Sequence, residues 1–192
     1  MIPILEKEFC GTSLRIVQAD ILHVRFDDIL PADISFVIAG NFPYNISSQI
    51  VFLGLQLRHR VPFMAGMFQK EMAERICSDP GSKAFWVISV LVQAYYNTSL
   101  LFTVKPGSFA PPPKVQSAVI SLTRYRHEIE GVPYNVLRQV VKMAFSQRRK
   151  KIRNTLKSLI PEETLKELAL VDLRPEQLTV DQFIMLARIV AT

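Results

Sequence analysis

The sequence predicts an α/β sheet followed by a small helical domain, and three observations indicate this fold class. The apolar run at residues 34–39 is typical of a buried strand in a parallel sheet, and after Ser47 and Ser48 apolar residues recur at helical spacing. Strand-like and helix-like patterns then alternate, and the last third of the chain is helical throughout. We therefore expect a sheet domain at residues 1–126 and a helical domain at residues 127–192.

The N-terminal part contributes one predicted helix and one predicted strand. Residues 4–9 indicate the end of a helix that closes near Gly11, and the alternation at residues 14–19 predicts a strand that ends at Asp20. An acidic side chain just past a strand can accept a hydrogen bond from an amino group. A lone Asp equally suits a helix cap or a turn, so Asp20 alone leaves both interpretations open.

The rest of the sheet domain alternates helices and strands. The patterns predict, in order, a helix from Ser47 to about residue 59, a strand at 62–69, an amphipathic helix at 70–77, a turn-rich loop at 79–83, a helix at 85–95, and two strands at 96–104 and 117–124. We expect the last two strands to pair antiparallel at one edge of the sheet. Trp86 fits the apolar spacing of its helix, so we assign it to the core.

A polar loop, Gly40–Ile46, lies between the apolar run and the helix that Ser47 or Ser48 would cap. Such a loop lies at the carboxyl edge of a sheet, where open α/β folds bind ligands. The Asn41 side-chain oxygen and the Pro43 carbonyl can hold both N–H groups of an adenine amine, while the Tyr44 ring stacks on the base. Positioning and fixed dipoles then supply much of the rate without a strong general base. The same residues also suit a simple turn, because Asn and Pro are turn formers.

The positive charge of the chain is concentrated in a short part of the helical domain. The stretch from Arg138 to Lys157 holds eight basic residues and no acidic one, whereas the remainder holds 15 basic and 17 acidic residues. A merely solvated helix face usually interleaves acidic partners, so the pattern favours a polyanion-binding surface over that alternative. The cations that we assign to this surface are Arg148, Arg149, Lys150, Lys151 and Arg153.

Helices fill the sequence after a polar hinge at residues 127–133. We expect one long helix or two between residues 134 and 160, and two further helices at 162–169 and 179–191. Thr179, followed by Gln182, gives the last helix a capping-type start.

Composition places the chain among globular proteins. Hydrophobic residues make up 49% of the 192 residues, and no apolar run reaches the length of a membrane-spanning helix. The N-terminal residues lack the basic-then-apolar layout of a signal peptide. We therefore expect a cytoplasmic protein in which Cys10 and Cys77 are reduced, with no metal site.

Five blocks of sequence resemble one enzyme family. Residues 41–48 are similar to the Asn-Leu-Pro-Tyr-Asn-Ile-Ser-Thr segment of the KsgA/Dim family of ribosomal RNA adenine dimethyltransferases. Four further blocks resemble that family in the same order, at residues 69–76, 109–119, 144–150 and 174–178. The match covers nearly the whole chain, and five collinear blocks are far more specific than any one of them.

The resemblance implies a Rossmann-like class I methyltransferase that uses S-adenosylmethionine and has a helical RNA-binding domain. Such an enzyme transfers methyl groups to N6 of adenines in small-subunit ribosomal RNA, twice per base, during ribosome biogenesis. Asn41, Pro43 and Tyr44 would hold the target base, and Phe109 would form the opposite wall of its slot. Three consecutive prolines stiffen the loop that presents Phe109. A proline-rich linker with an anchoring Phe is the alternative interpretation of this loop.

The same resemblance implies only part of a cofactor site. In the family the position of Asp20 contacts the cofactor adenine, with Ile21 packed beside it, and we also assign Asn41 to this site. The glycine-rich loop that cradles the methionine part has no counterpart, since the chain has seven glycines and no Gly-x-Gly pair. The strand that ends at Asp20 matches the family's third strand. We therefore expect a chain truncated at its N-terminus, inactive alone, that binds S-adenosylmethionine weakly or not at all. Its amino-terminal edge should be either unstable or rescued by self-association.

Two other functions remain open from the sequence. One is a large-subunit ribosomal RNA adenine methyltransferase of the macrolide-resistance type, against which the blocks at 144–150 and 174–178 argue. The other is a catalytically silent RNA- or DNA-binding relative, against which the intact loop around Asn41 argues. The partners implied by the resemblance are ribosomal RNA and the small ribosomal subunit, with no membrane.

Overall fold

The computed structural model describes residues 2–191, which divide into a short unit that ends at Ile34 and a larger unit that begins at Ser35. The first unit contains helix α1 (Ile2–Glu8), followed by Gly11 at a φ of +81°, and the 3-10 turn η1 (Phe26–Asp28). The strand predicted at residues 14–19 was wrong, because within this unit the segment has no ladder partner.

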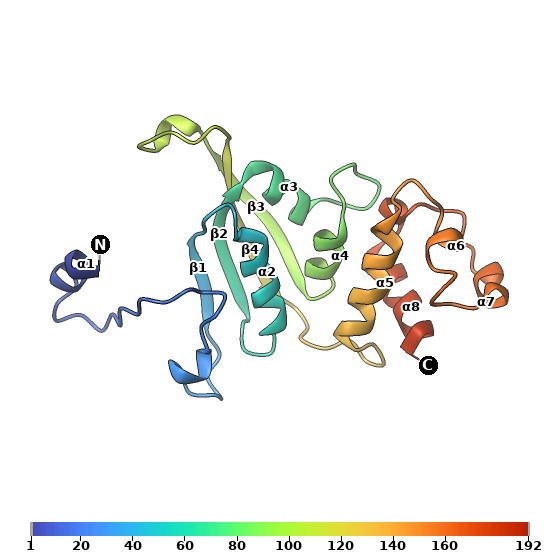
Figure 1. Cartoon of the computed structure of the whole chain (residues 1–192), viewed down its shortest axis with the longest axis horizontal. Coiled ribbons are helices and arrows are strands. Elements are labelled where there is room, and N and C mark those ends of the chain that lie inside the picture. The colour runs from blue at the N-terminus through green and yellow to red at the C-terminus, as the bar shows by residue number, and fades with distance from the viewer. Residues whose placement is uncertain (1, 192) are drawn as a thin grey trace. The chain divides into compact units, whose positions relative to one another are not determined.

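Four strands form the sheet of the larger unit (Figure 1). Their order is β1-β2-β4-β3, with β1 parallel to β2 and β4 antiparallel to both of its neighbours. This arrangement confirms the antiparallel pair predicted at one edge. The bounds are β1 (Val37–Asn41), β2 (Phe63–Gln69), β3 (Tyr96–Val104) and β4 (Ser117–Arg124).

Strand β1 is less buried than its apolar sequence predicts. It begins at Val37, and of its side chains only Ile38 is buried. Val37 keeps 55% of its surface exposed because β1 is an edge strand of the described sheet. An apolar run alone cannot distinguish an edge strand from a central one, so the prediction of a buried strand was wrong in this respect. The expected self-association through this edge stays a prediction.

Three helices belong to the sheet part of the larger unit. The bounds are α2 (Ser47–Gln56), α3 (Lys70–Cys77) and α4 (Val87–Gln93). Helix α2 connects β1 to β2, and a Cβ added to its Gly54 would meet the Met64 sulfur at 2.2 Å, so the helix packs closely on β2. One face of β2 and β4 is buried, with Met64, Phe68, Ile120 and Leu122 in the core. The two cysteines are free, as expected.

Trp86 lies at the boundary between the sheet part and the helices that follow. It is half-exposed, so its assignment to the core holds for one side of the ring only. The indole contacts Phe145 at a centroid distance of 5.3 Å, and the Arg148 guanidinium lies 4.8 Å from its ring. Phe145 in turn stacks on Phe183 at 5.8 Å. This aromatic cluster joins α4 to the helical part.

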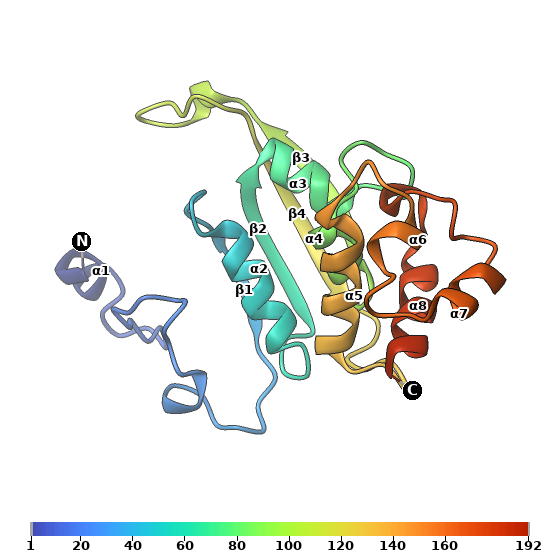
Figure 2. The same ribbon diagram turned by 45° about the vertical axis from the view of Figure 1, so that its right-hand side comes forward.

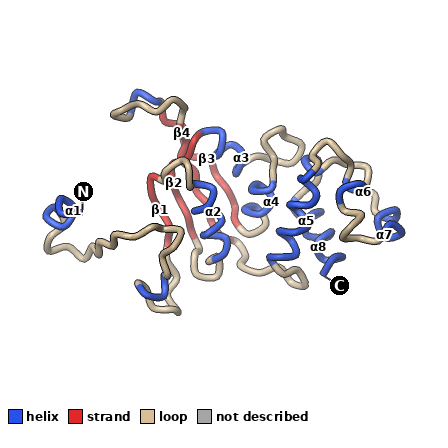
Figure 3. Tube along the Cα trace, viewed as in Figure 1, coloured by secondary structure: helices blue, strands red, loops and turns tan. Residues whose placement is uncertain are grey.

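After residue 133 the regular elements of the described chain are all helices, joined by loops (Figure 3). Two helices rather than one form between residues 134 and 160, because Gln147 leaves the helical conformation (φ −132°, ψ 68°). The first of them and the last helix of the chain lie side by side (Figure 2). The bounds are α5 (Tyr134–Ser146), α6 (Ile152–Thr155), α7 (Glu162–Glu167) and α8 (Val180–Ala191).

The capping-type start of α8 is confirmed. The Gln182 N–H donates to the Thr179 hydroxyl oxygen at 3.2 Å, and the Thr179 N–H donates to the Gln182 side-chain oxygen at 2.9 Å. Helices α5 and α8 both pack against α4. A domain boundary at residue 126 therefore stays a prediction. No helix within residues 2–191 combines the length and apolar character needed to cross a bilayer.

Candidate active site

The loop after β1 and the loop between β3 and β4 leave the sheet at the same edge. Asn41, the last residue of β1, is in register with Met67 of β2, which is opposite Val119 of β4. Because β4 is antiparallel to β2, its first residues lie at this edge, together with the last residues of β3. The sequence prediction that the Asn41 loop lies at the carboxyl edge of the sheet is confirmed.

Phe42 anchors the Asn41 loop in the core. Its ring is 8% exposed and packs edge-on against Phe68, with 5.3 Å between the ring centroids. Two glycines that face each other on β1 and β2 make room for it. A Cβ on Gly66 would meet the ring at 2.2 Å, and one on Gly40 would meet it at 3.2 Å. The backbone on both sides of Phe42 is fixed as a result.

Tyr44 is held at the far end of the same loop. Its hydroxyl lies 2.5 Å from the hydroxyl of Ser117, the first residue of β4, and its carbonyl accepts a hydrogen bond from the Ser47 hydroxyl at 3.1 Å. The prediction that Ser47 or Ser48 caps α2 was wrong, since the N-cap position is Ile46 and no side chain caps it. Ser47 is buried, and a buried hydroxyl bonds to the nearest acceptor, here in the preceding loop.

Two acceptors of the loop are available to a ligand. The Asn41 side chain is exposed and makes no hydrogen bond within residues 2–191. The Pro43 carbonyl accepts a hydrogen bond from the Ile46 N–H at 3.1 Å, and a carbonyl oxygen has a second lone pair. The loop therefore has two open acceptor positions, and the grip of both on one amine stays a prediction.

Phe109 lies on an arm formed by residues 105–116, which projects from β3 and β4 (Figure 1). The arm contains the 3-10 turn η2 (Pro106–Ser108), whose Pro106 carbonyl accepts the Phe109 N–H at 3.1 Å, and a cis peptide bond before Pro111. The Tyr44–Ser117 hydrogen bond ties the Asn41 loop to the base of the arm. No ring contact between Phe109 and Tyr44 occurs among residues 2–191, so the two-walled slot stays a prediction.

Asp20 closes a local turn in the N-terminal unit. One carboxylate oxygen accepts the Leu22 N–H at 2.9 Å, and the other lies 2.9 Å from His23 Nδ1. The hydrogen bond from Leu22, followed by that from His23, lowers the pKa of Asp20. The side chain is 55% exposed, and each carboxylate oxygen keeps a further acceptor site, so it fits an additional amino donor. Ile21 beside it is half-buried, and cofactor binding by both residues stays a prediction.

Arg148 differs from the other predicted RNA-binding cations because it is engaged inside the protein. Its guanidinium donates to the Lys83 carbonyl at 2.7 Å, stacks over Trp86, and lies 3.7 Å from a Glu176 carboxylate oxygen. The Glu176 carbonyl accepts the Gly81 N–H at 2.6 Å. Two of the sequence blocks, at residues 144–150 and 174–178, therefore meet at the loop before α4.

Lys151 and Arg153 share one acidic partner. Asp172 Oδ1 lies 3.0 Å from Lys151 Nζ and 3.1 Å from Arg153 Nη1. The inference that this stretch lacks compensating acids was wrong, because the acids come from a distant part of the chain where i,i+4 spacing cannot reveal them. Arg149 and Lys150 are exposed and have no ion-pair partner within residues 2–191.

The fold is that of a class I S-adenosylmethionine-dependent methyltransferase sheet with a helical C-terminal part, and its polar loop lies at the ligand-binding edge. Residues 1–191 match the family model described as ribosomal RNA adenine dimethylase. The chain belongs to this family.

Two relatives in sequence carry the name ribosomal RNA small subunit methyltransferase A. The protein of Flavobacterium johnsoniae is 47% identical over 174 residues, which cover 91% of this chain and 66% of that protein. The protein of Porphyromonas gingivalis is 44% identical over 183 residues, which cover 95% of this chain and 71% of that protein. The chain thus spans about two thirds of the length of these relatives.

Two solved structures share the fold at low sequence identity. A dimethyladenosine transferase from Plasmodium falciparum is 21% identical, with a TM-score of 0.80 over 96% of this chain and 75% of that one. The 23S rRNA methyltransferase ErmE is 20% identical, with a TM-score of 0.67 over 99% of this chain and 78% of that one.

Proposed function

We propose that the chain carries the base-holding loop and the RNA-binding helices of a ribosomal RNA adenine N6,N6-dimethyltransferase that acts on small-subunit RNA in the cytoplasm. The observation that carries this proposal is the exposed, unbonded Asn41 amide at the end of β1, in a loop whose backbone the buried Phe42 fixes. The names of relatives that are 44% and 47% identical support the choice of the small-subunit substrate.

The loop would act by holding the target amine. The Asn41 oxygen and the Pro43 carbonyl accept its two N–H groups, which favours a pyramidal nitrogen with its lone pair directed at the methyl donor. Stacking on Tyr44 contributes about 1–3 kcal/mol to base binding. The hydrogen bond to Ser117 holds this ring in place before the base arrives, so less conformational entropy is lost on binding. Phe109 would cover the other face of the base.

The cofactor S-adenosylmethionine supplies an electrophilic methyl group when bound. Asp20 and Ile21 would hold its adenine. Asp20 can accept the adenine amine while it keeps its local turn, because its carboxylate has spare acceptor sites.

The RNA backbone would be bound by the exposed cations after α5. Arg149 and Lys150 can contact phosphates directly, whereas Lys151 and Arg153 must first exchange the carboxylate of Asp172 for a phosphate. We propose that Arg148 is a positioning residue that fixes this stretch to Trp86 and Lys83. Affinity for RNA should fall steeply as salt concentration rises.

Methyl transfer to small ribosomal subunits that lack the modification tests the proposal. The assay uses the chain joined to the segment of the Flavobacterium relative that it does not span. Asn41→Ala should abolish turnover while RNA binding survives, because the variant loses only the hydrogen bond that the target amine donates to the Asn41 side-chain oxygen. Asn45→Ala, in the same exposed loop, is the matched control and should retain most of the turnover. Turnover that persists in Asn41→Ala would refute the amine-holding role.

The other two candidate functions give different results in this assay. Large-subunit RNA is the second candidate substrate, and the fold that the chain shares with the 23S rRNA methyltransferase ErmE is compatible with it. Methylation of large subunits in preference to small ones would support that candidate. RNA binding without any methyl transfer would instead support a catalytically silent relative.

A further inference from the structure

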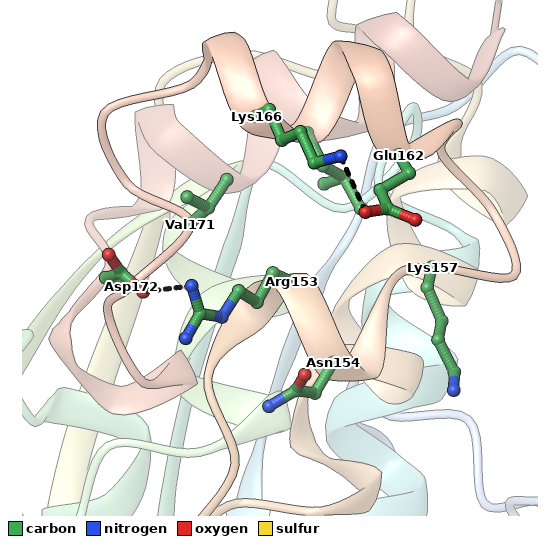
Figure 4. Close-up of a pocket in the computed structure, with 8 residues that line it drawn as sticks. Arg153, Asn154, Lys157, Glu162, Lys166, Val171 and Asp172 are labelled. Atoms are coloured by element: carbon green, nitrogen blue, oxygen red, sulfur yellow. Dashed lines mark ion pairs between the residues drawn. The ribbon is translucent and has the colours of Figure 1, made fainter.

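A cavity of about 540 Å³ lies among the C-terminal helices, between α6, α7 and the segment that follows α7 (Figure 4). Its lining is rich in charged and polar side chains, and two ion pairs lie among them. These side chains are Arg153, Asn154, Lys157, Glu162, Lys166 and Asp172.

Cations outnumber acids around this cavity. Arg153 pairs with Asp172 at 3.1 Å, and Lys166 pairs with Glu162 at 2.8 Å, while Lys157 has no ion-pair partner within residues 2–191. Lys151 adds a further positive charge, since its Nζ lies 3.0 Å from the same Asp172 oxygen. One carboxylate oxygen therefore bridges two cations, which is also how a phosphate oxygen binds between basic side chains.

The ion pairs of the cavity are exposed to solvent, so a negative ligand can replace a carboxylate in them at little cost in free energy. Asp172 and Arg153 keep 59% and 53% of their side-chain surface exposed, and Glu162 and Lys166 keep 74% and 71%. Exposed pairs of this kind contribute little to stability. The Lys151 ammonium beside Asp172, with Arg153 adding to it, lowers the pKa of that carboxyl, so the acid remains charged at neutral pH. A negative ligand must displace it.

We propose that this cavity binds a backbone phosphate of RNA, and that the Asp172 carboxylate occupies the phosphate position in the free protein. The inference rests on the proposed function, because that function supplies the polyanion. It assigns the phosphate to Lys151 and Arg153, which hold the Asp172 carboxylate, and Lys157 and Asn154 are further donors of the same cavity. Asp172 then keeps the cations apart and in place until RNA arrives, and it weakens binding to anions too small to make further contacts.

Fluorescence anisotropy with a fluorescein-labelled RNA hairpin, titrated with the full chain from 50 to 200 mM NaCl, tests the proposal. Asp172→Asn should bind the hairpin about threefold more tightly than the wild type, because no carboxylate then competes with RNA for Lys151 and Arg153. Asp181→Asn makes the same charge change on α8, outside the cavity, and should bind like the wild type. Arg153→Gln/Lys157→Gln should bind more weakly, with a salt slope shallower by about 0.7–0.9, the value for one phosphate.

The proposal is supported only if Asp172→Asn binds more tightly and the double variant has a shallower salt slope. Both variants must also unfold cooperatively like the wild type. Equal affinities of Asp172→Asn and Asp181→Asn would overturn it, and so would an unchanged salt slope in the double variant. In those cases salt-dependent binding by the wild type would leave the proposed function standing. If no variant binds the hairpin, both proposals fail.

Discussion

Replacing Gly66 by Ala tests whether Phe42 fixes the Asn41 loop. The added Cβ would lie 2.2 Å from Cε2 and 2.7 Å from Cδ2 of Phe42, and 3.0 Å from the Gly40 carbonyl oxygen. The ring cannot retreat freely because it packs against Phe68. Overpacking of this kind costs about 1–3 kcal/mol, and for a chain of this size each kcal/mol lowers Tm by about 2–4 °C. Any relief must come from movement of the loop, so methyl transfer should fall as well.

The assay combines urea and thermal unfolding, followed by circular dichroism, with the methyl-transfer measurement on the joined chain. Gly107→Ala is the matched control, because no atom lies within 4 Å of its added Cβ, and its stability should change by less than about 0.5 kcal/mol. Phe42→Leu/Gly66→Ala places a smaller side chain in the slot. It should be less destabilised than the sum of the single changes by about 0.5–3 kcal/mol, as expected for residues in contact.

Two results would refute this account of the loop. Wild-type stability of Gly66→Ala would mean that the ring does not occupy the space above Gly66. Additive effects in the double variant would mean that Phe42 and Gly66 are not coupled, and the loop would then be positioned by other contacts.

Three further predictions concern side chains that join distant segments. Arg148→Gln should lower the free energy of unfolding, measured in urea, by about 1.5–3 kcal/mol, because it removes a charged hydrogen bond to the Lys83 carbonyl. Arg148→Lys should not restore the lost stability. Unchanged stability together with a shallower salt slope of RNA binding would instead make Arg148 a phosphate ligand. Arg58→Ala should lower the free energy of unfolding by about 1–3 kcal/mol in the same measurement, since the Arg58 guanidinium lies 4.7 Å from the Tyr95 ring and 5.0 Å from the Tyr134 ring. Wild-type stability of this variant would show that these two contacts do not stabilise the fold. Burial raises the pKa of Tyr96 to about 12, above the value of about 10 expected in the unfolded chain. The folded state then holds a proton that the unfolded state releases, so stability should fall between these pH values. Burial also raises the pKa values of Tyr95 and Tyr134, so urea unfolding of Tyr96→Phe should show a smaller decrease than the wild type, and an equal decrease would contradict the assignment.

Much of the fold follows from local patterns. The strands at residues 96–104 and 117–124 and the helix at residues 70–77 form with the predicted bounds, because alternation and helical spacing are properties of neighbouring residues. The capping box at Thr179 is equally local. The loop chemistry is local too, since the acceptors at Asn41 and Pro43 and the ring of Tyr44 lie within four consecutive residues.

The sequence by itself thus determined the alternation of elements, the place of the Asn41 loop at the carboxyl edge of the sheet and the concentration of positive charge. Only the tertiary structure decided that β1 is an exposed edge, that Gly66 leaves room for the Phe42 ring, and that Asp172 pairs with Lys151 and Arg153. The physical reason is that burial and ion pairing depend on which distant segments meet. Local spacing contains no information about those meetings, and this is why the partners of the basic residues were missed.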